Sequence, residues 1–155
     1  MRRSILPRLL VSALAGLQLA APAVDAAEPS GVAIIVARGT PVADMDRHEL
    51  ALIYKRKKRF WPDGRRIAPV NLPASQTVRR AFSVAILGHT PEDLDEYWRD
   101  QYFHGELPPF VASSEEAVIR FVASTPGAVG YISACLADKR IAVLMVIDEG
   151  LPCSR

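Results

Sequence analysis

Residues 67 to 87 read IAPVNLPASQTVRRAFSVAIL, and this stretch contains the transition that decides the fold class. Residues 67 to 72 are mostly apolar and follow a Trp-Pro-Asp-Gly turn, which is typical of a short buried strand. After residues 75 to 77 (SQT), apolar side chains recur at helical spacing, which predicts a helix that ends before Gly88. The stretch therefore predicts a strand that passes directly into a helix.

The same alternation continues on both sides of this unit. Residues 32 to 36 (VAIIV) and 141 to 147 (IAVLMVI) are unbroken apolar runs, so both are predicted to be central strands, and residues 128 to 132 (AVGYI) form another strand. Capping sequences predict further helix starts at residues 46–49, 90–93 and 113–116. Strands that alternate with helices predict an α/β fold with a mainly parallel sheet flanked by helices.

The first 26 residues have the pattern of a signal peptide. Three arginines precede an apolar, alanine-rich run, and small residues offer cleavage sites after Ala23 or Ala26, of which we favour the later. An uncleaved membrane anchor is the alternative, but it normally requires a longer apolar run. We therefore expect a periplasmic protein in which residues 27–155 form one domain.

Charge limits the partners of the exported part. The leader contains three arginines and one aspartate, so its removal reduces 19 basic and 17 acidic residues to 16 of each. No global positive charge remains, and nucleic acid is not an expected partner of an exported protein. The basic residues Lys55 to Arg59 have two interpretations: cations that favour a helix end, or a docking surface for an anionic membrane or an acidic protein.

The residue types that carry most enzyme chemistry form no pattern in this chain. The three histidines are far apart and match no zinc-binding spacing, and nucleophile-elbow and nucleotide-binding loops are absent from the sequence. We expect no enzymatic activity, no metal and no cofactor. The two cysteines, Cys135 and Cys153, lie in the exported part, which predicts a structural disulfide, with free buried thiols as the alternative.

Residues Ser75, Gln76 and Thr77 are the best candidate ligand-binding residues. The first N–H groups of a helix lack helical acceptors, and two hydroxyls beside them can add donors for a small oxyanion. Thr40 follows the first predicted strand, so we expect it at the same carboxyl edge of the sheet. The alternative is that Ser75 only caps its own helix.

Three segments of the chain resemble a known family. Residues 52 to 57 (LIYKRK), the turn FWPDG and the segment PGAVGY are similar to landmarks of the phosphate-binding proteins of ABC transporters, over about residues 32 to 133. The resemblance implies one lobe of a type 2 periplasmic solute-binding fold. It also implies binding of phosphate or another small oxyanion and work with an ABC transporter, in uptake or sensing, or with another envelope protein.

The ligand loop departs from the family in two ways. Ser75 and Thr77 match the two hydroxyl positions of that family, but Ala74 and Gln76 replace its glycines, and no arginine precedes the loop. Glycines let the backbone approach an anion closely. The second hypothesis is therefore a periplasmic accessory or interaction protein that has lost small-ligand binding.

Overall fold

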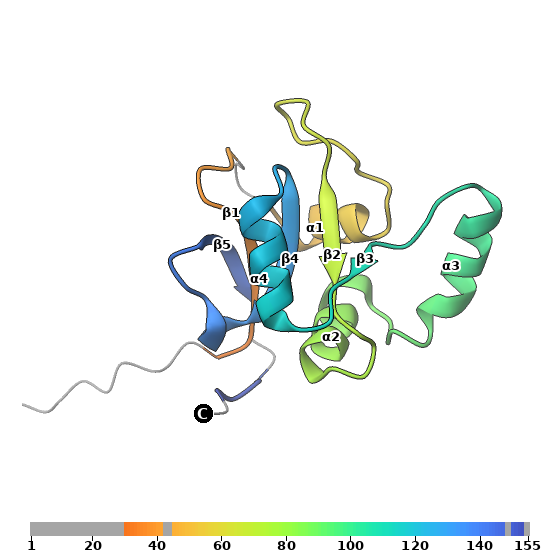
Figure 1. Ribbon diagram of the computed structural model, residues 1–155. Helices are drawn as coiled ribbons and strands as arrows, with labels where there is room; N and C mark the ends of the chain where they lie inside the picture. Colours follow the sequence, from red (N-terminus) through yellow and green to blue (C-terminus); the bar gives the residue numbers. More distant parts are fainter. Residues whose placement is uncertain (1–29, 42–44, 148–149, 154–155) are drawn as a thin grey trace, which may run out of the picture.

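The computed structural model describes residues 30–41, 45–147 and 150–153 (Figure 1). The predicted signal peptide lies outside the described residues. The strands are β1 (Val32–Ala37), β2 (Ala68–Asn71), β3 (Phe110–Val111), β4 (Ala128–Ser133) and β5 (Ile141–Ile147). The helices are α1 (Arg47–Tyr54), α2 (Thr77–Phe82), α3 (Leu94–Phe103) and α4 (Glu115–Ser124), with a π-helical turn η1 (Ser83–Leu87) and a 3₁₀ turn η2 (Ala134–Leu136). None of the helices described in these ranges combines the length and apolarity that a membrane crossing requires.

The five strands form one mixed sheet in the order β3-β2-β4-β1-β5. β2 pairs in parallel with β3 and β4, whereas β1 pairs antiparallel with both β4 and β5. Four strands thus run in one direction, and β1 runs against them. The predicted α/β class and mainly parallel sheet are confirmed, with β1 as the exception.

The position of β5 in the sheet differs from the prediction. Its unbroken apolar sequence predicts a central strand, but β5 lies at the edge of the sheet with β1 as its partner. Val143 and Val146 are therefore about half exposed. An apolar run reports that a strand is hydrophobic, whereas its place in a sheet depends on which segments pair with it.

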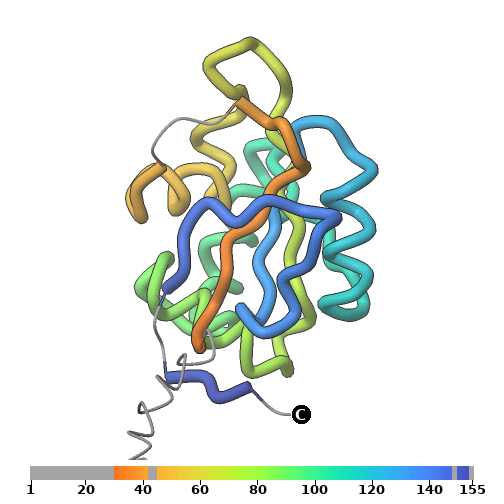
Figure 2. Tube along the Cα trace, turned by 90° about the vertical axis from the view of Figure 1, so that its left-hand side faces the viewer, coloured from red at the N-terminus to blue at the C-terminus, as the bar shows by residue number. Residues whose placement is uncertain are grey.

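Helices cover both faces of the sheet. Figure 2 shows α4 on one side of the strands, and α1 with α2 on the other. α3 stands apart at the side of the molecule (Figure 1), where the hydroxyl of Tyr97 donates a hydrogen bond to the carbonyl of Lys55 at 2.8 Å. The two-sided cover explains why β1, in the interior of the sheet, is almost completely buried.

Three aromatic rings fill the core between the sheet and the helices α1 and α2. Phe82 stacks on Tyr131 with ring centroids 3.9 Å apart, and Tyr54 lies 4.6 Å from Phe82. Buried tyrosine hydroxyls need partners, and that of Tyr54 donates to the carbonyls of Val70 and Val129. The rings thus join the helices to β2 and β4.

Two glycines of the PGAVGY segment, residues 126 to 131, lie where a side chain would clash with neighbouring atoms. Gly127 adopts a left-handed φ of 80°, and a Cβ there would lie 2.3 Å from the carbonyl oxygen of Arg66. A Cβ on Gly130 would lie 2.6 Å from Cγ1 of Val118 in α4. Both glycines are therefore needed for close packing, the first against the turn before β2 and the second against α4.

The helices α1 and α4 begin where the sequence predicts, whereas α3 does not. Asp46 and Ser114 accept hydrogen bonds from the backbone N–H groups of Glu49 and Ala117, as their capping positions predict. α3 begins at Leu94, later than the sequence predicts. Thr90 and Asp93 instead bind each other's backbone N–H groups and close a separate turn.

The carboxyl-terminal tail returns to the body of the domain. Cys135 and Cys153 form a disulfide with their Cα atoms 5.7 Å apart, which confirms the predicted pair. The N–H of Gly31 donates to the carbonyl of Leu151. These two links hold the tail beside the amino end of β1.

Candidate functional site

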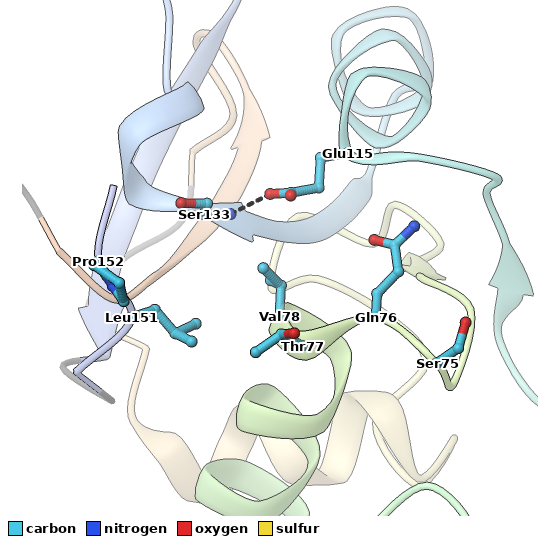
Figure 3. A pocket seen from close by; sticks show the side chains of 8 residues that line it. All are labelled: Ser75, Gln76, Thr77, Val78, Glu115, Ser133, Leu151 and Pro152. Carbon is cyan, nitrogen blue, oxygen red and sulfur yellow. Dashed lines mark hydrogen bonds between the residues drawn. The ribbon is translucent and has the colours of Figure 1, made fainter. Parts of the chain in front are cut away.

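A cavity of about 490 Å³ opens where β2 and β4 end and α2 and α4 begin (Figure 3). Its walls come from four segments: the loop and first turn of α2, the first residue of α4, the last residue of β4 and the carboxyl-terminal tail. The lining residues are Ser75, Gln76, Thr77, Val78, Glu115, Ser133, Leu151 and Pro152. The predicted ligand-binding residues Ser75, Gln76 and Thr77 are therefore together in one cavity at the start of α2.

The hydroxyls of this loop are not used for helix capping. The N-cap of α2 is Gln76, whose side chain makes no capping hydrogen bond. The interpretation that Ser75 only caps its helix is therefore wrong. Within the described part of the chain, the hydroxyls of Ser75 and Thr77 make no intramolecular hydrogen bond, and both residues are exposed. They are available to a ligand.

The side chain of Gln76 makes a hydrogen bond within the domain. Its side-chain nitrogen donates to the carbonyl of Ser113 at 3.4 Å, which links the loop before α2 to the segment before α4. In Figure 3 the Gln76 side chain extends toward Glu115, while Ser75 lies farther out. Gln76 therefore helps to shape the cavity.

Glu115 adds a carboxylate that the sequence indicated only as part of a helix start. Its Oε2 accepts a hydrogen bond from the N–H of Ser133 at 2.5 Å, drawn as a dashed line in Figure 3. This bond ties the start of α4 to the end of β4. The sequence signal for this contact is weak, because a Glu beside Ser114 is ordinary in the first turn of any helix.

A buried cation lies at the same end of β2. Arg79, in α2, is only 7% exposed, and its Nη1 donates to Oδ1 of Asn71 and to the hydroxyl of Tyr131. Its Nε has no hydrogen-bond partner, and it forms no ion pair with any carboxylate in residues 30–41, 45–147 or 150–153. In the described part of the chain, the positive charge of Arg79 therefore has no ion-paired carboxylate.

Neighbouring tyrosines do not supply the missing negative charge. Burial raises the pKa of Tyr131 and raises that of Tyr54 well above its ordinary value, although Arg79 opposes both shifts. Both phenols stay neutral at neutral pH. A buried charge without a counter-charge is costly, so this cluster favours an anion nearby.

Thr40 does not belong to the cavity. Its hydroxyl donates to the carbonyl of Ala37 at 2.7 Å, which closes the turn after β1. β1 runs antiparallel to β4, whereas β2 runs parallel to it, so β1 and β2 end at opposite edges of the sheet. The expectation that Thr40 lies at the same edge of the sheet as Ser75 is wrong. The sequence of a strand does not show in which direction the strand runs within the sheet.

Most of the basic run is engaged within the domain. Lys57 donates to Gln101, and ion pairs join Lys58 to Glu49 and Arg59 to Glu106. The run therefore packs the end of α1 against its surroundings, and Lys55 and Arg56 are the cations whose side chains have no such partner among the described residues. The following FWPDG segment forms the predicted turn, closed by a hydrogen bond from Gly64 N–H to the carbonyl of Trp61.

An α/β domain with a hydroxyl-lined cavity at the carboxyl ends of parallel strands has the architecture of a small-molecule binding domain. The described residues contain no cluster of His, Cys, Asp and Glu side chains placed to hold a metal ion. These features define the class of site.

The structure resembles substrate-binding proteins of phosphate ABC transporters. An ABC-type phosphate transport receptor from Vibrio cholerae aligns with a TM-score of 0.59 and 26% identity, over 74% of this chain and 45% of that one. A phosphate ABC transporter substrate-binding protein from Clostridium perfringens, solved with bound phosphate, aligns with a TM-score of 0.60 and 23% identity, over 79% and 46%. PstS from Borrelia burgdorferi aligns with a TM-score of 0.56 and 14% identity, over 81% and 49%.

The chain is therefore a small relative, in fold, of these binding proteins, as its sequence resemblance predicts. It spans somewhat less than half of their length, which agrees with a single lobe. No family model matches the chain, and no curated protein matches its sequence significantly.

Proposed function

We propose that this protein is an exported, non-catalytic solute-binding protein that holds a phosphate-like oxyanion in the cavity before α2. The observation that carries the proposal is the uncompensated charge of Arg79 beside a loop with two unused hydroxyls. The fold of the solved phosphate-binding relatives supports the same ligand class. Export rests on the leader pattern of the first 26 residues.

Three cavity residues and the buried Arg79 beside them have distinct roles in this proposal. Ser75 and Thr77 donate hydroxyl hydrogen bonds to the anion, and the first N–H groups of α2 add backbone donors. Gln76 shapes the wall, and Arg79 supplies a positive field from within the domain. Together these groups can replace part of the hydration shell of a small anion.

Glu115 restricts which oxyanion fits. A carboxylate only accepts hydrogen bonds and repels an anion that is fully ionised. An oxyanion that keeps a proton at neutral pH, such as hydrogen phosphate, can donate a hydrogen bond from its O–H group to the carboxylate of Glu115, whereas sulfate has no such group. The proposed ligand is therefore hydrogen phosphate rather than sulfate.

The chain spans less than half the length of the binding proteins that it resembles, so the described residues provide only one wall of such a site. Two-lobed binding proteins close on their ligand from both sides, and one lobe leaves part of the anion in water. We therefore expect weak binding by the isolated monomer, and stronger binding where a second copy or an envelope protein, such as an ABC transporter, supplies the missing wall. The biological role would be phosphate uptake or sensing.

A second function also has support. The loop has Ala74 and Gln76 in place of glycines, and a carboxylate lines the cavity. Both features weaken anion binding. They favour a periplasmic accessory protein that has kept the fold and lost the ligand.

One titration separates these two functions. The exported form of the chain, purified with its disulfide intact, is melted in increasing phosphate, and in sulfate at matched ionic strength. A saturable rise in Tm with phosphate alone supports the binding protein, because a ligand that binds only the folded state stabilises it. An equal dependence of Tm on both salts would contradict phosphate binding and favour the accessory protein.

A further inference from the structure

Exposed apolar side chains are concentrated in one segment of the chain, from the end of α3 to β3. Ten large apolar residues are exposed in the described ranges, and five of them lie between positions 102 and 111. They are Tyr102, Phe103, Leu107, Phe110 and Val111. Single exposed apolar residues are normal, but a cluster of this kind marks an interaction surface.

Two of these residues, Leu107 and Phe110, line a second cavity of about 360 Å³, which we call the β3 groove. Its lining includes Pro69 of β2, Leu107 and Phe110 of the β3 segment, and Phe121 of α4. The rings of Phe110 and Phe121 lie 5.5 Å apart and form one wall. The groove is therefore largely apolar.

β3 itself leaves a sheet edge open. It pairs with β2 and ends the strand order, and it lies on the side of the sheet that faces α3 (Figure 1). An edge strand presents backbone N–H and C=O groups that an extended chain can pair with. The apolar groove and the open edge therefore adjoin.

Two cations line the same groove. Arg56 and Arg66 are both in its wall, and neither forms an ion pair with a carboxylate in the part of the chain that the structure describes. Arg56 has a left-handed φ of 62°, which is unusual for a residue other than glycine, and its buried Nε has no hydrogen-bond partner among the described residues. Burial, and then the charges of Arg66 and Arg59, lower its pKa. The two positive charges of the groove thus lack a carboxylate partner among the described residues, and the groove is complementary to an acidic ligand.

We propose that the β3 groove binds an extended, acidic and apolar segment of a partner protein. The segment adds a strand to β3, places apolar side chains against Phe110 and Phe121, and sets carboxylates beside Arg56 and Arg66. Charge complementarity selects an acidic segment, and the concave apolar wall selects a peptide chain over a flat lipid surface. Two of the neighbouring lysines, Lys57 and Lys58, are poor lipid anchors because they are already engaged within the domain.

The test begins with a phage-displayed library of short random peptides, selected against the exported form of the chain. We expect a consensus that alternates apolar residues with Asp or Glu. A synthetic peptide of that consensus should bind in fluorescence anisotropy, with affinity that falls as salt rises. Hydrogen exchange should slow at residues 107–112 when the peptide is added, and stay unchanged at residues 75–78.

Variants connect this binding to the groove. Arg56→Gln with Arg66→Gln, and separately Phe110→Ser, should each weaken the peptide about tenfold or more. Matched controls remove a comparable group elsewhere: Arg120→Gln an exposed cation, and Val84→Ser an exposed apolar side chain. Both controls should bind the peptide as the unmodified chain does, and circular dichroism should show that every variant is folded.

Three outcomes overturn the proposal. In the first, the selection yields no acidic, apolar consensus. In the second, the selected peptide binds the groove variants as tightly as it binds the unmodified chain. In the third, vesicles of phosphatidylglycerol and phosphatidylethanolamine bind the chain with the same dependence on Arg56, Arg66 and Phe110, which would assign the surface to a membrane. The phosphate titration addresses the other end of the sheet, so either proposal can fail alone.

Discussion

Arg79 Nη1 donates a hydrogen bond to Oδ1 of Asn71, which joins the first turns of α2 to the last residue of β2. The hydroxyl of Tyr131 donates to the same oxygen at 3.1 Å and accepts the N–H of Leu72 at 3.2 Å. Asn71 and Leu72 would therefore keep a partner if Arg79 were removed. The charge of Arg79 is less necessary to the fold than its burial suggests.

Arg79→Met should leave the free energy of unfolding unchanged or raise it by about 1–2 kcal/mol in the absence of anions, since a buried, uncompensated charge is removed. The same variant should lose the phosphate-dependent rise in Tm. Chemical denaturation with and without phosphate measures both effects. Arg80→Met is the control, because Arg80 is exposed and pairs with Glu92 at the surface. A loss of stability above about 3 kcal/mol, with the phosphate effect retained, would make Arg79 purely structural.

Thr77→Val should abolish the phosphate-dependent rise in Tm, because valine has the same shape and no hydroxyl. Stability without phosphate should change by less than about 1 kcal/mol, since the Thr77 hydroxyl has no partner in the described structure. Thr40→Val provides the contrast: it removes a hydroxyl at the opposite edge of the sheet and should keep the phosphate response. Equal responses of the two variants to phosphate would exclude Thr77 from the site.

Glu115→Gln should reduce the selectivity between phosphate and sulfate. The amide oxygen can still accept the N–H of Ser133, so the link between β4 and α4 remains. The repulsion of a fully ionised anion disappears, and sulfate should then raise Tm as phosphate does. If sulfate stays ineffective in this variant, Glu115 does not contact the anion.

Gly130→Ala should destabilise the domain by about 1–3 kcal/mol, because the added Cβ would lie 2.6 Å from Cγ1 of Val118 and 3.0 Å from side-chain carbons of Val122 and Val70. The double variant with Val118→Ala should recover part of the loss, and urea unfolding of the two single variants and the double one measures the coupling. Additive effects would contradict the proposed contact between β4 and α4.

Removing the disulfide with Cys135→Ser and Cys153→Ser should cost about 3 kcal/mol, the loop-closure value for two cysteines 18 residues apart. Leu151 and Pro152 line the cavity, so the phosphate-dependent rise in Tm should also shrink. Thermal melts of the variant with and without phosphate test both effects. An unchanged phosphate response would show that the tail is not a functional wall of the cavity.

The sequence alone predicted the units of the fold. Strands β1, β2, β4 and β5 and the helix starts at Asp46 and Ser114 follow from local apolar patterns and capping side chains, which act over a few residues. The disulfide followed from there being only two cysteines. Ser75, Gln76 and Thr77 were identified as neighbours because they are adjacent in the chain.

Only the tertiary structure decided which distant residues meet. The direction of β1 and the edge position of β5 depend on long-range pairing, so the sequence misplaced Thr40 and the strand at residues 141–147. Glu115, Ser133 and the buried cluster around Arg79 become part of the site for the same reason: α2, α4 and β4 converge at the end of β2. Local side-chain patterns encode the elements, whereas a site made of several elements exists only once they pack.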